Sequence, residues 1–161
     1  MVPEIVNLTE KQLIGKKIRM SFSNDKTIGL WKSFAPRIKE IRNSMNPDLY
    51  SVDIYNDPDF FTDFNPSKEF DKWAAIEVTN LDEIPDEMDS LVIPQGLYAV
   101  FPYKGKPSEA QKAFQYIYGV WLPASLYDLD DRPQMAKMGE KYKGEDPDSE
   151  EEFWIPVKSK A

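Results

Sequence analysis

The sequence predicts an α+β fold, in which two β-α-β-β units join their strands in one antiparallel sheet and lay two main helices against it. Short segments with apolar residues at every second position, typical of half-buried strands, alternate with two longer segments in which apolar residues recur three and four positions apart, typical of amphipathic helices. The same order of segments recurs in the second half. We therefore expect pseudo-repeats over about residues 11–79 and 92–158 of a single domain that spans residues 1–161.

Three strands are predicted in the first half. They cover residues 11–22, 49–55 and 72–78, where apolar and polar side chains alternate. Side chains two residues apart point to the same face of a sheet, so Trp73 and Glu77 share one face of the third strand. The rest of this strand is apolar, which makes the acid at Glu77 unusual. It lies either on a solvated edge or in a pocket.

Two amphipathic helices separate the strands. Residues 27–43 form the first, and Pro36 inside it should kink or restart the helix because proline lacks the backbone N–H that a helix interior uses. The second helix starts near Pro107 and ends at Pro123, since proline suits the first turn of a helix and also follows its end.

The second half contains three more predicted strands. Residues 96–103 form the first, residues 138–142 a weak second strand, and residues 153–157 the last. We interpret residues 80–91 as the linker between the halves, and the acidic segment 144–152 as a solvated loop. That loop could bind a hard cation through its oxygens, but it lacks the spacing of a calcium loop.

The composition excludes several classes of function. A net charge of −8, from 28 acidic and 20 basic residues, disfavours direct nucleic-acid binding and favours cationic ligands or basic protein surfaces. Solubility alone is the alternative explanation of this charge. Cysteine and histidine are absent, so we expect no disulfide, no zinc site and no cofactor. Neither a membrane span nor a signal peptide is evident, which predicts a cytoplasmic protein. Phosphate-binding glycine loops and nucleophile elbows are also missing.

Several motifs together resemble the GyrI-like, AraC-type effector-binding domain superfamily, including its stand-alone integron-associated members. The segments that carry the resemblance, in order along nearly the whole chain, are Gly29–Phe34 with Ile38 and Ile41–Asn43, Tyr50–Tyr55, Trp73–Val78, Ile93–Phe101, Ala113–Pro123 and Trp154–Val157. The resemblance implies the tandem fold and binding of aromatic or cationic drug-like molecules near a buried glutamate, which maps onto Glu77. Many relatives carry a DNA-binding helix-turn-helix region, for which we expect no room here.

Eight residues are candidates for a ligand site. A cationic ligand or tyrosine hydroxyls would offset the cost of burying Glu77, and flat rings stack on flat ligands and attract cations. Aromatic residues at helical spacing can instead belong to the core, which is the alternative for Phe34 and Trp121. The candidates are Glu77, Trp73, Trp31, Phe34, Tyr103, Tyr118, Trp121 and Tyr142.

The leading functional prediction is a stand-alone domain that senses or sequesters an aromatic, lipophilic, possibly cationic molecule. The resemblance also implies a second function, hydrolysis of cyclopropane-containing genotoxic natural products, in which Glu77 would orient or deprotonate a water. A third is protein binding, as in the gyrase inhibitors of the superfamily, through the acidic surface.

Overall fold

The computed structural model describes residues 2–57, 59–61 and 64–160. Its strands are β1 (Glu4–Leu8), β2 (Lys11–Met20), β3 (Leu49–Ile54), β4 (Phe70–Glu77), β5 (Asp89–Ile93), β6 (Gly96–Lys104), β7 (Tyr127–Leu129), β8 (Gln134–Met138) and β9 (Glu150–Ser159). Its helices are α1 (Thr27–Phe34), α2 (Gln111–Tyr116), α3 (Leu122–Ala124), the 3-10 helices η1 (Ala35–Glu40) and η2 (Pro107–Glu109), and the π-helical turn η3 (Ile117–Trp121). None of these helices is long and apolar enough to cross a membrane.

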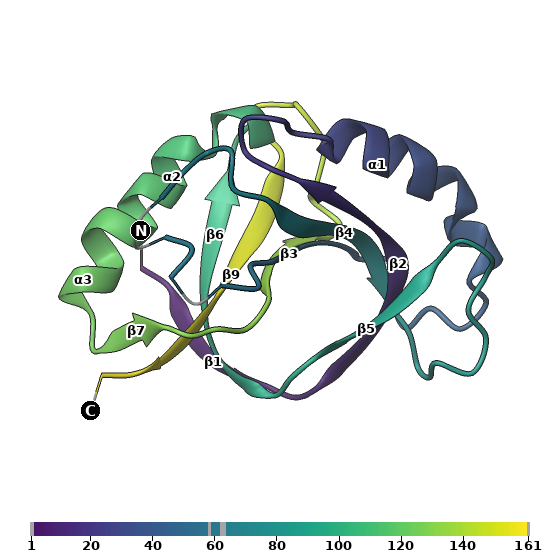
Figure 1. Ribbon diagram of the computed structural model, residues 1–161, viewed down its shortest axis with the longest axis horizontal. Coiled ribbons are helices and arrows are strands. Elements are labelled where there is room, and N and C mark those ends of the chain that lie inside the picture. Colours follow the sequence, from purple (N-terminus) through teal and green to yellow (C-terminus); the bar gives the residue numbers. More distant parts are fainter. Residues whose placement is uncertain (1, 58, 62–63, 161) are drawn as a thin grey trace.

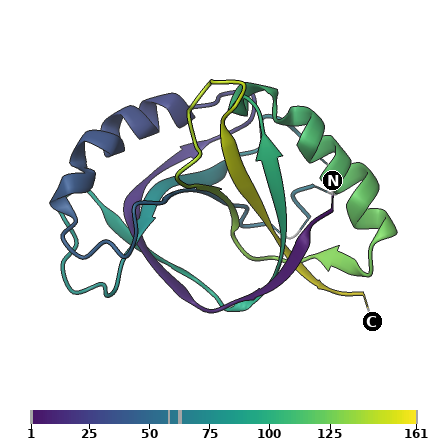
Figure 2. The same cartoon turned by 180° about the vertical axis from the view of Figure 1, so that it is seen from behind.

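The strands form one antiparallel sheet in the order β1-β6-β9-β8-β3-β4-β2-β5, and β7 adds to β9. The pairing of β1 with β6 continues without a change of register into the pairing of β2 with β5, from Leu8 opposite Gly96 to Lys11 opposite Ile93. The two ends of the sheet are therefore joined by the chain itself. Figures 1 and 2 show the result, a strongly curved sheet whose underside is crossed by β1, β2, β5 and β6.

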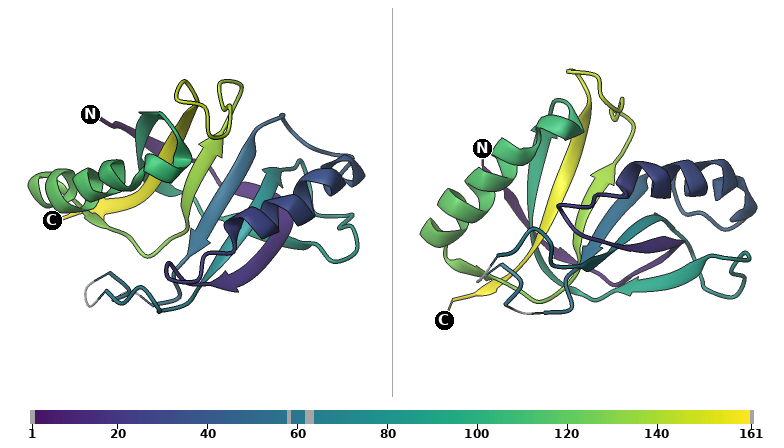
Figure 3. Two further views of the ribbon diagram at one scale, coloured as in Figure 1. Left: turned by 90° about the horizontal axis from the view of Figure 1, so that it is seen from above. Right: turned by 45° about the horizontal axis from the view of Figure 1, so that its top comes forward.

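Both helical segments cover the same face of the sheet, on its outer side (Figure 3). Leu30 and Phe34 of α1 pack on a cluster with Ile76 of β4. The second helical segment, residues 107–124, packs on the other half of the sheet, where Ile117 meets Phe101. The opposite, inner face carries a third cluster, whose buried members are Leu8, Leu13, Tyr50, Val52, Trp73, Ala75, Ile93, Tyr98, Val100 and Met135. The fold is thus one sheet with a core on each face.

The predicted fold class is confirmed: the sheet is antiparallel and two main helices lie against it. The interruption at Pro36 is also confirmed, because α1 ends at Phe34 and a 3-10 helix begins with that proline in its first turn. The elements β2-α1-β3-β4 recur in order as β6-α2-β8-β9, and the strand order is symmetric when the halves are exchanged. This arrangement is compatible with the pseudo-repeats, which stay a prediction.

Three predictions about strands were wrong. The weak strand expected at residues 138–142 lies at Gln134–Met138, because Met135 pairs with Val52 of β3 and residues 139–142 turn back on themselves. The expected acidic loop ends early, since β9 already begins at Glu150. The end of the expected linker, residues 89–91, is the start of β5, in which the exposed Asp89 and Ser90 hid a strand that runs on to the buried Ile93. The short strands β1 and β7 were not foreseen.

Candidate functional site

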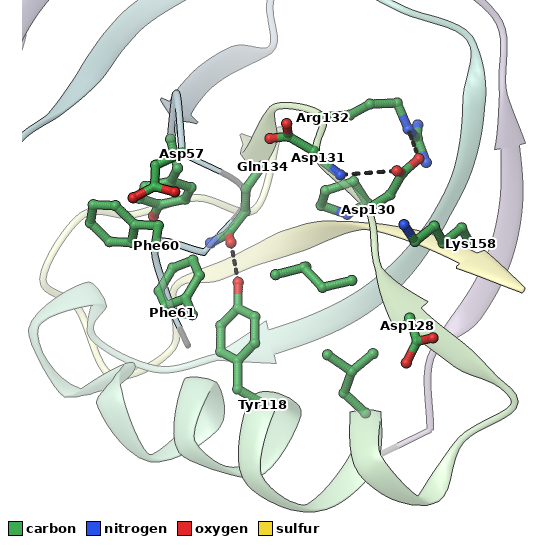
Figure 4. Close-up of a pocket in the computed structure, with 14 residues that line it drawn as sticks. Asp57, Phe60, Phe61, Tyr118, Asp128, Asp130, Asp131, Arg132, Gln134 and Lys158 are labelled. Carbon is green, nitrogen blue, oxygen red and sulfur yellow. Dashed lines mark hydrogen bonds and ion pairs between the residues drawn. The ribbon is translucent and has the colours of Figure 1, made fainter. Parts of the chain in front are cut away.

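A cavity of about 490 Å³ lies where the segment after β3, the second helical segment and the β7–β8 loop meet. Figure 4 shows side chains from all three elements around it. Its size falls within the range of about 300–1,000 Å³ that is usual for small-molecule sites. We call it the aromatic pocket, and its lining residues are Tyr55, Asp57, Phe60, Phe61, Tyr118, Leu122, Asp128, Leu129, Asp130, Asp131, Arg132, Gln134, Pro156 and Lys158.

Four rings form one wall of the aromatic pocket. Phe61 stacks on Tyr118 with ring centroids 5.3 Å apart, so the segment after β3 is packed onto the second helical segment. Tyr55 and Phe60 have ring centroids 4.6 Å apart, and Phe60 meets Phe61 edge to face at 5.0 Å. Both halves of the chain therefore contribute to a wall that suits a flat or multi-ring ligand.

The hydroxyl groups of this wall are held by a buried and a half-buried polar partner. Tyr118 donates its hydroxyl hydrogen to Gln134 Oε1, and Tyr55 donates to Asp53 Oδ2 at 3.1 Å. Lys72 Nζ lies 2.8 Å from the other oxygen of Asp53 and balances its charge. Burial, and next the charge of Asp53, raises the pKa of Tyr55 and of Tyr118 well above the usual value for tyrosine. Both hydroxyl groups are therefore neutral hydrogen-bond donors at any pH the protein meets.

Acidic groups outnumber basic ones around the aromatic pocket. Four aspartates line it, against Arg132 and Lys158. Asp130 is paired with Arg132 at 2.7 Å, and Asp57 with Lys68 at 2.6 Å. Within the described part of the chain, Asp128 and Asp131 have no ion-pair partner. Lys158 lies opposite Asp128 in the pairing of β7 with β9, so two carboxylates and one lysine remain without an ion-pair partner among the described residues, and the site lined by rings keeps a net negative charge that attracts cations.

Arg132 forms part of the frame of the pocket. Its guanidinium donates to the backbone oxygens of Leu97 at 2.6 Å and Val157 at 3.1 Å, and it lies over the ring of Tyr98 at 4.8 Å. A Cβ atom on Gly96 would lie only 2.3 Å from Arg132 Nη1, so the glycine leaves the room that this guanidinium fills. Arg132 therefore fastens the β7–β8 loop to β6 and β9 and positions Asp130 at the pocket.

Glu77 lies elsewhere, on the inner face of the sheet. Its exposed fraction is 8%, and it does not line the aromatic pocket. The carboxylate accepts from Lys11 Nζ at 3.1 and 3.3 Å and from Asn46 Nδ2 at 3.2 Å. Burial, and next the charge of Glu77, raises the pKa of the Tyr50 hydroxyl, which is hydrogen-bonded to the same carboxylate. The acid that the family resemblance singles out is thus nearly buried and already paired with a cation of the chain.

The remaining candidates are spread over the molecule. Trp73 belongs to the inner cluster, on the same face of β4 as Glu77. Trp31 and the fully buried Phe34 pack between α1 and the sheet. Trp121 and Tyr103 pack with the second helical segment. Tyr142 lies half-buried between β8 and β9, where burial raises its pKa. Of the eight candidates, Tyr118 alone lines the aromatic pocket.

Glu151 is a buried acid that the sequence reasoning missed. Its exposed fraction is 8%, and in the part of the chain that the structure describes its Oε2 has no hydrogen-bond partner. Burial raises the pKa of this carboxyl to about 7, although nearby Lys72 acts in the opposite direction. The signal was present in the sequence, because Glu151 alternates with Phe153 and Ile155 on one face of β9. In the sequence-based prediction, Glu151 belongs instead to the acidic loop at residues 144–152.

The rings at Tyr55, Phe60 and Phe61 were also missed. They lie in the connection between β3 and β4; Tyr55 was predicted as the last residue of a strand, and Phe60 and Phe61 lie outside any periodic segment. The density of aromatic residues there was the available signal. Near the site and elsewhere, the described residues contain no cluster of acidic side chains that could hold a metal ion.

Comparisons with known proteins agree with this architecture. A family model described as a GyrI-like small molecule binding domain matches residues 1–158. The transcriptional regulator BrlR of Pseudomonas aeruginosa is 28% identical over 134 residues, which are 81% of this chain and 46% of BrlR. The chain thus spans about half the length of that relative. The expectation that it does not bind nucleic acid directly stays a prediction.

Solved structures share the fold over nearly the whole chain. SAV2435, in complex with tetraphenylphosphonium, has a TM-score of 0.72 at 16% identity, covering 98% of this chain and 94% of that one. An integron cassette protein from the mobile metagenome of Vibrio cholerae has a TM-score of 0.68 at 16% identity, covering 98% and 97%. Such a likeness at low identity establishes the fold, and the ligand has to be argued from the residues of this chain.

Proposed function

Because this chain belongs to the GyrI-like small molecule binding domain family, we propose that it binds aromatic, lipophilic cations in the aromatic pocket. The observation that carries the proposal is a cavity of about 490 Å³ that combines a wall of four rings with a surplus of carboxylates. The faces of aromatic rings attract a cation, and the negative charges of Asp128 and Asp131 attract it as well. A multi-ring cation satisfies both features at once.

Tetraphenylphosphonium is a suitable probe, since it is the ligand of the structurally similar SAV2435 and carries four phenyl rings around one positive charge. We expect titration calorimetry to detect its binding to the wild-type chain. Triphenylphosphine oxide, which has three of these rings but no net charge, should bind at least about tenfold more weakly. Equal affinity for the two compounds would remove the role of the acidic groups.

Variants locate the site. Phe61→Ala removes the ring stacked on Tyr118 and should weaken tetraphenylphosphonium binding about tenfold. Asp128→Asn combined with Asp131→Asn should weaken it by a similar factor, about five- to tenfold. Asp82→Asn combined with Glu83→Gln removes the same net charge from an exposed loop outside this pocket and should leave affinity unchanged.

The inner face around Glu77 is the competing location, because the family resemblance maps the ligand-binding acid there. A cation that binds at Glu77 has to displace Lys11, which holds both carboxylate oxygens. Loss of binding in Glu77→Gln, with full affinity kept in the pocket variants, would place the ligand at the inner face and overturn the proposal.

A further inference from the structure

The floor of the aromatic pocket carries a hydrogen-bond donor. Gln134, at the start of β8, lines the pocket with an exposed fraction of 8%. Its Oε1 accepts from the Tyr118 hydroxyl. In the described residues its amide nitrogen has no hydrogen-bond partner, and Figure 4 shows this nitrogen turned towards the side lined by Phe60 and Phe61. A carboxamide nitrogen carries two N–H donors, so at least one faces the rings unpaired.

Tyr118 fixes the direction in which this amide points. Its ring is stacked between Phe61, at 5.3 Å, and Phe114, at 6.5 Å between centroids. Burial raises the pKa of its hydroxyl well above the usual range, so the group keeps its hydrogen. A held O–H donor stabilises the amide oxygen on its own side of Gln134, which leaves the NH2 group on the cavity side.

A neutral donor among rings cannot balance a ligand's positive charge, but it can recognise an acceptor. The amide nitrogen opens onto the cavity, so a ligand oxygen in the pocket can accept a hydrogen bond from it, whereas a ligand group that cannot accept would cover the N–H and leave it unpaired at a cost in free energy. We propose that Gln134, positioned by Tyr118, makes the pocket select aromatic cations that carry a hydrogen-bond acceptor, such as a carbonyl, on the ring that reaches the floor. This selection rests on the proposed function of the same pocket. The carboxylates attract the cation, and the amide chooses among cations.

Two probes of matched shape test the selection. In (4-acetylphenyl)triphenylphosphonium and (4-isopropenylphenyl)triphenylphosphonium, the charge and ring number are equal, and a carbonyl oxygen replaces a CH2 group. We expect the wild-type chain to bind the acetyl compound about five- to tenfold more tightly, which is the worth of one hydrogen bond to a neutral group. Gln134→Leu should bind the two compounds with a ratio of affinities near one.

Tyr118→Phe separates positioning from packing. The phenyl ring keeps the stacking on Phe61, whereas the amide of Gln134 loses the hydroxyl that orients it. We expect the preference for the acetyl compound to fall by about half or more. A cooperative thermal unfolding transition shows that each variant is folded.

The outcomes distinguish the two proposals. Wild-type binding of tetraphenylphosphonium with no preference between the matched probes would overturn the role of Gln134 and leave the proposed function standing. A preference that persists in Gln134→Leu would likewise overturn it. Failure of all three phosphonium compounds to bind would overturn both.

Discussion

Replacing Glu151 by glutamine should stabilise the protein increasingly as the pH rises from about 4.5 to about 7. The wild-type carboxyl has a pKa of about 7 in the folded chain, against an ordinary value of 4.5, because burial disfavours its charged form. Between these values the folded state holds a proton that the unfolded state has released. The free energy of unfolding therefore falls as the pH rises from about 4.5 to about 7, and the loss is complete above that.

The size of the loss follows from the same two pKa values. A difference of this size corresponds to a ceiling of about 3 kcal/mol, and partial relaxation of the site reduces it to about 2 kcal/mol. Glutamine has nearly the same shape and no charge, so Glu151→Gln should exceed the free energy of unfolding of the wild type by less than about 1 kcal/mol at pH 5 and by about 2 kcal/mol at pH 8.5.

Urea denaturation at pH 5, 7 and 8.5 measures the effect, with Glu150→Gln as the matched control. Glu150 is the neighbouring strand residue, so its side chain points to the opposite face of β9. This control should show the same pH dependence as the wild type. A difference between Glu151→Gln and wild type that stays constant from pH 5 to pH 8.5 would refute the account of a carboxyl strained by burial.

Two further perturbations test the frame around the sites. Lys11→Met leaves Glu77 without its cation and should lower the free energy of unfolding by about 2 kcal/mol. The double variant Lys11→Met with Glu77→Gln should recover at least half of this loss. Equal stability of the single and double variants would contradict the pairing. Gly96→Ala places a methyl group where the Arg132 guanidinium lies and should lower the free energy of unfolding by about 2 kcal/mol, as measured by thermal and urea denaturation. In the Arg132→Ala background the same glycine change should cost less than about 0.5 kcal/mol, and additive losses would contradict the contact.

The sequence predicts what depends on local periodicity. Trp73 and Glu77 share a face of β4, as their spacing requires, and Pro36 interrupts the first helix for a reason internal to proline. The predicted bounds of the weak strand were wrong because pairing with β3 fixes the position of β8. Met135 lies opposite Val52 in this pairing, and no local sequence pattern contains that information.

The aromatic pocket depends on contacts between residues far apart in the chain. Phe61 and Tyr118 are stacked although 57 positions separate them, and the cavity exists only because the β7–β8 loop closes its third side. We expected a cationic ligand to balance the charge of Glu77, but its partner is Lys11 on β2, the strand next to β4. Pairings of this kind arise from tertiary structure and leave no signature in sequence spacing.

The pairing in one register of β1 with β6 and of β2 with β5 makes each half of the molecule complete the sheet of the other. The strand at the start of the chain borders β6, and the strand before β6 borders β2, so a piece ending near residue 80 would lack β5 and leave the edge of β2 bare. Two such pieces, produced separately and mixed, should fold only upon one another. Exchange of these strands between two copies of the chain is the corresponding hazard at high concentration.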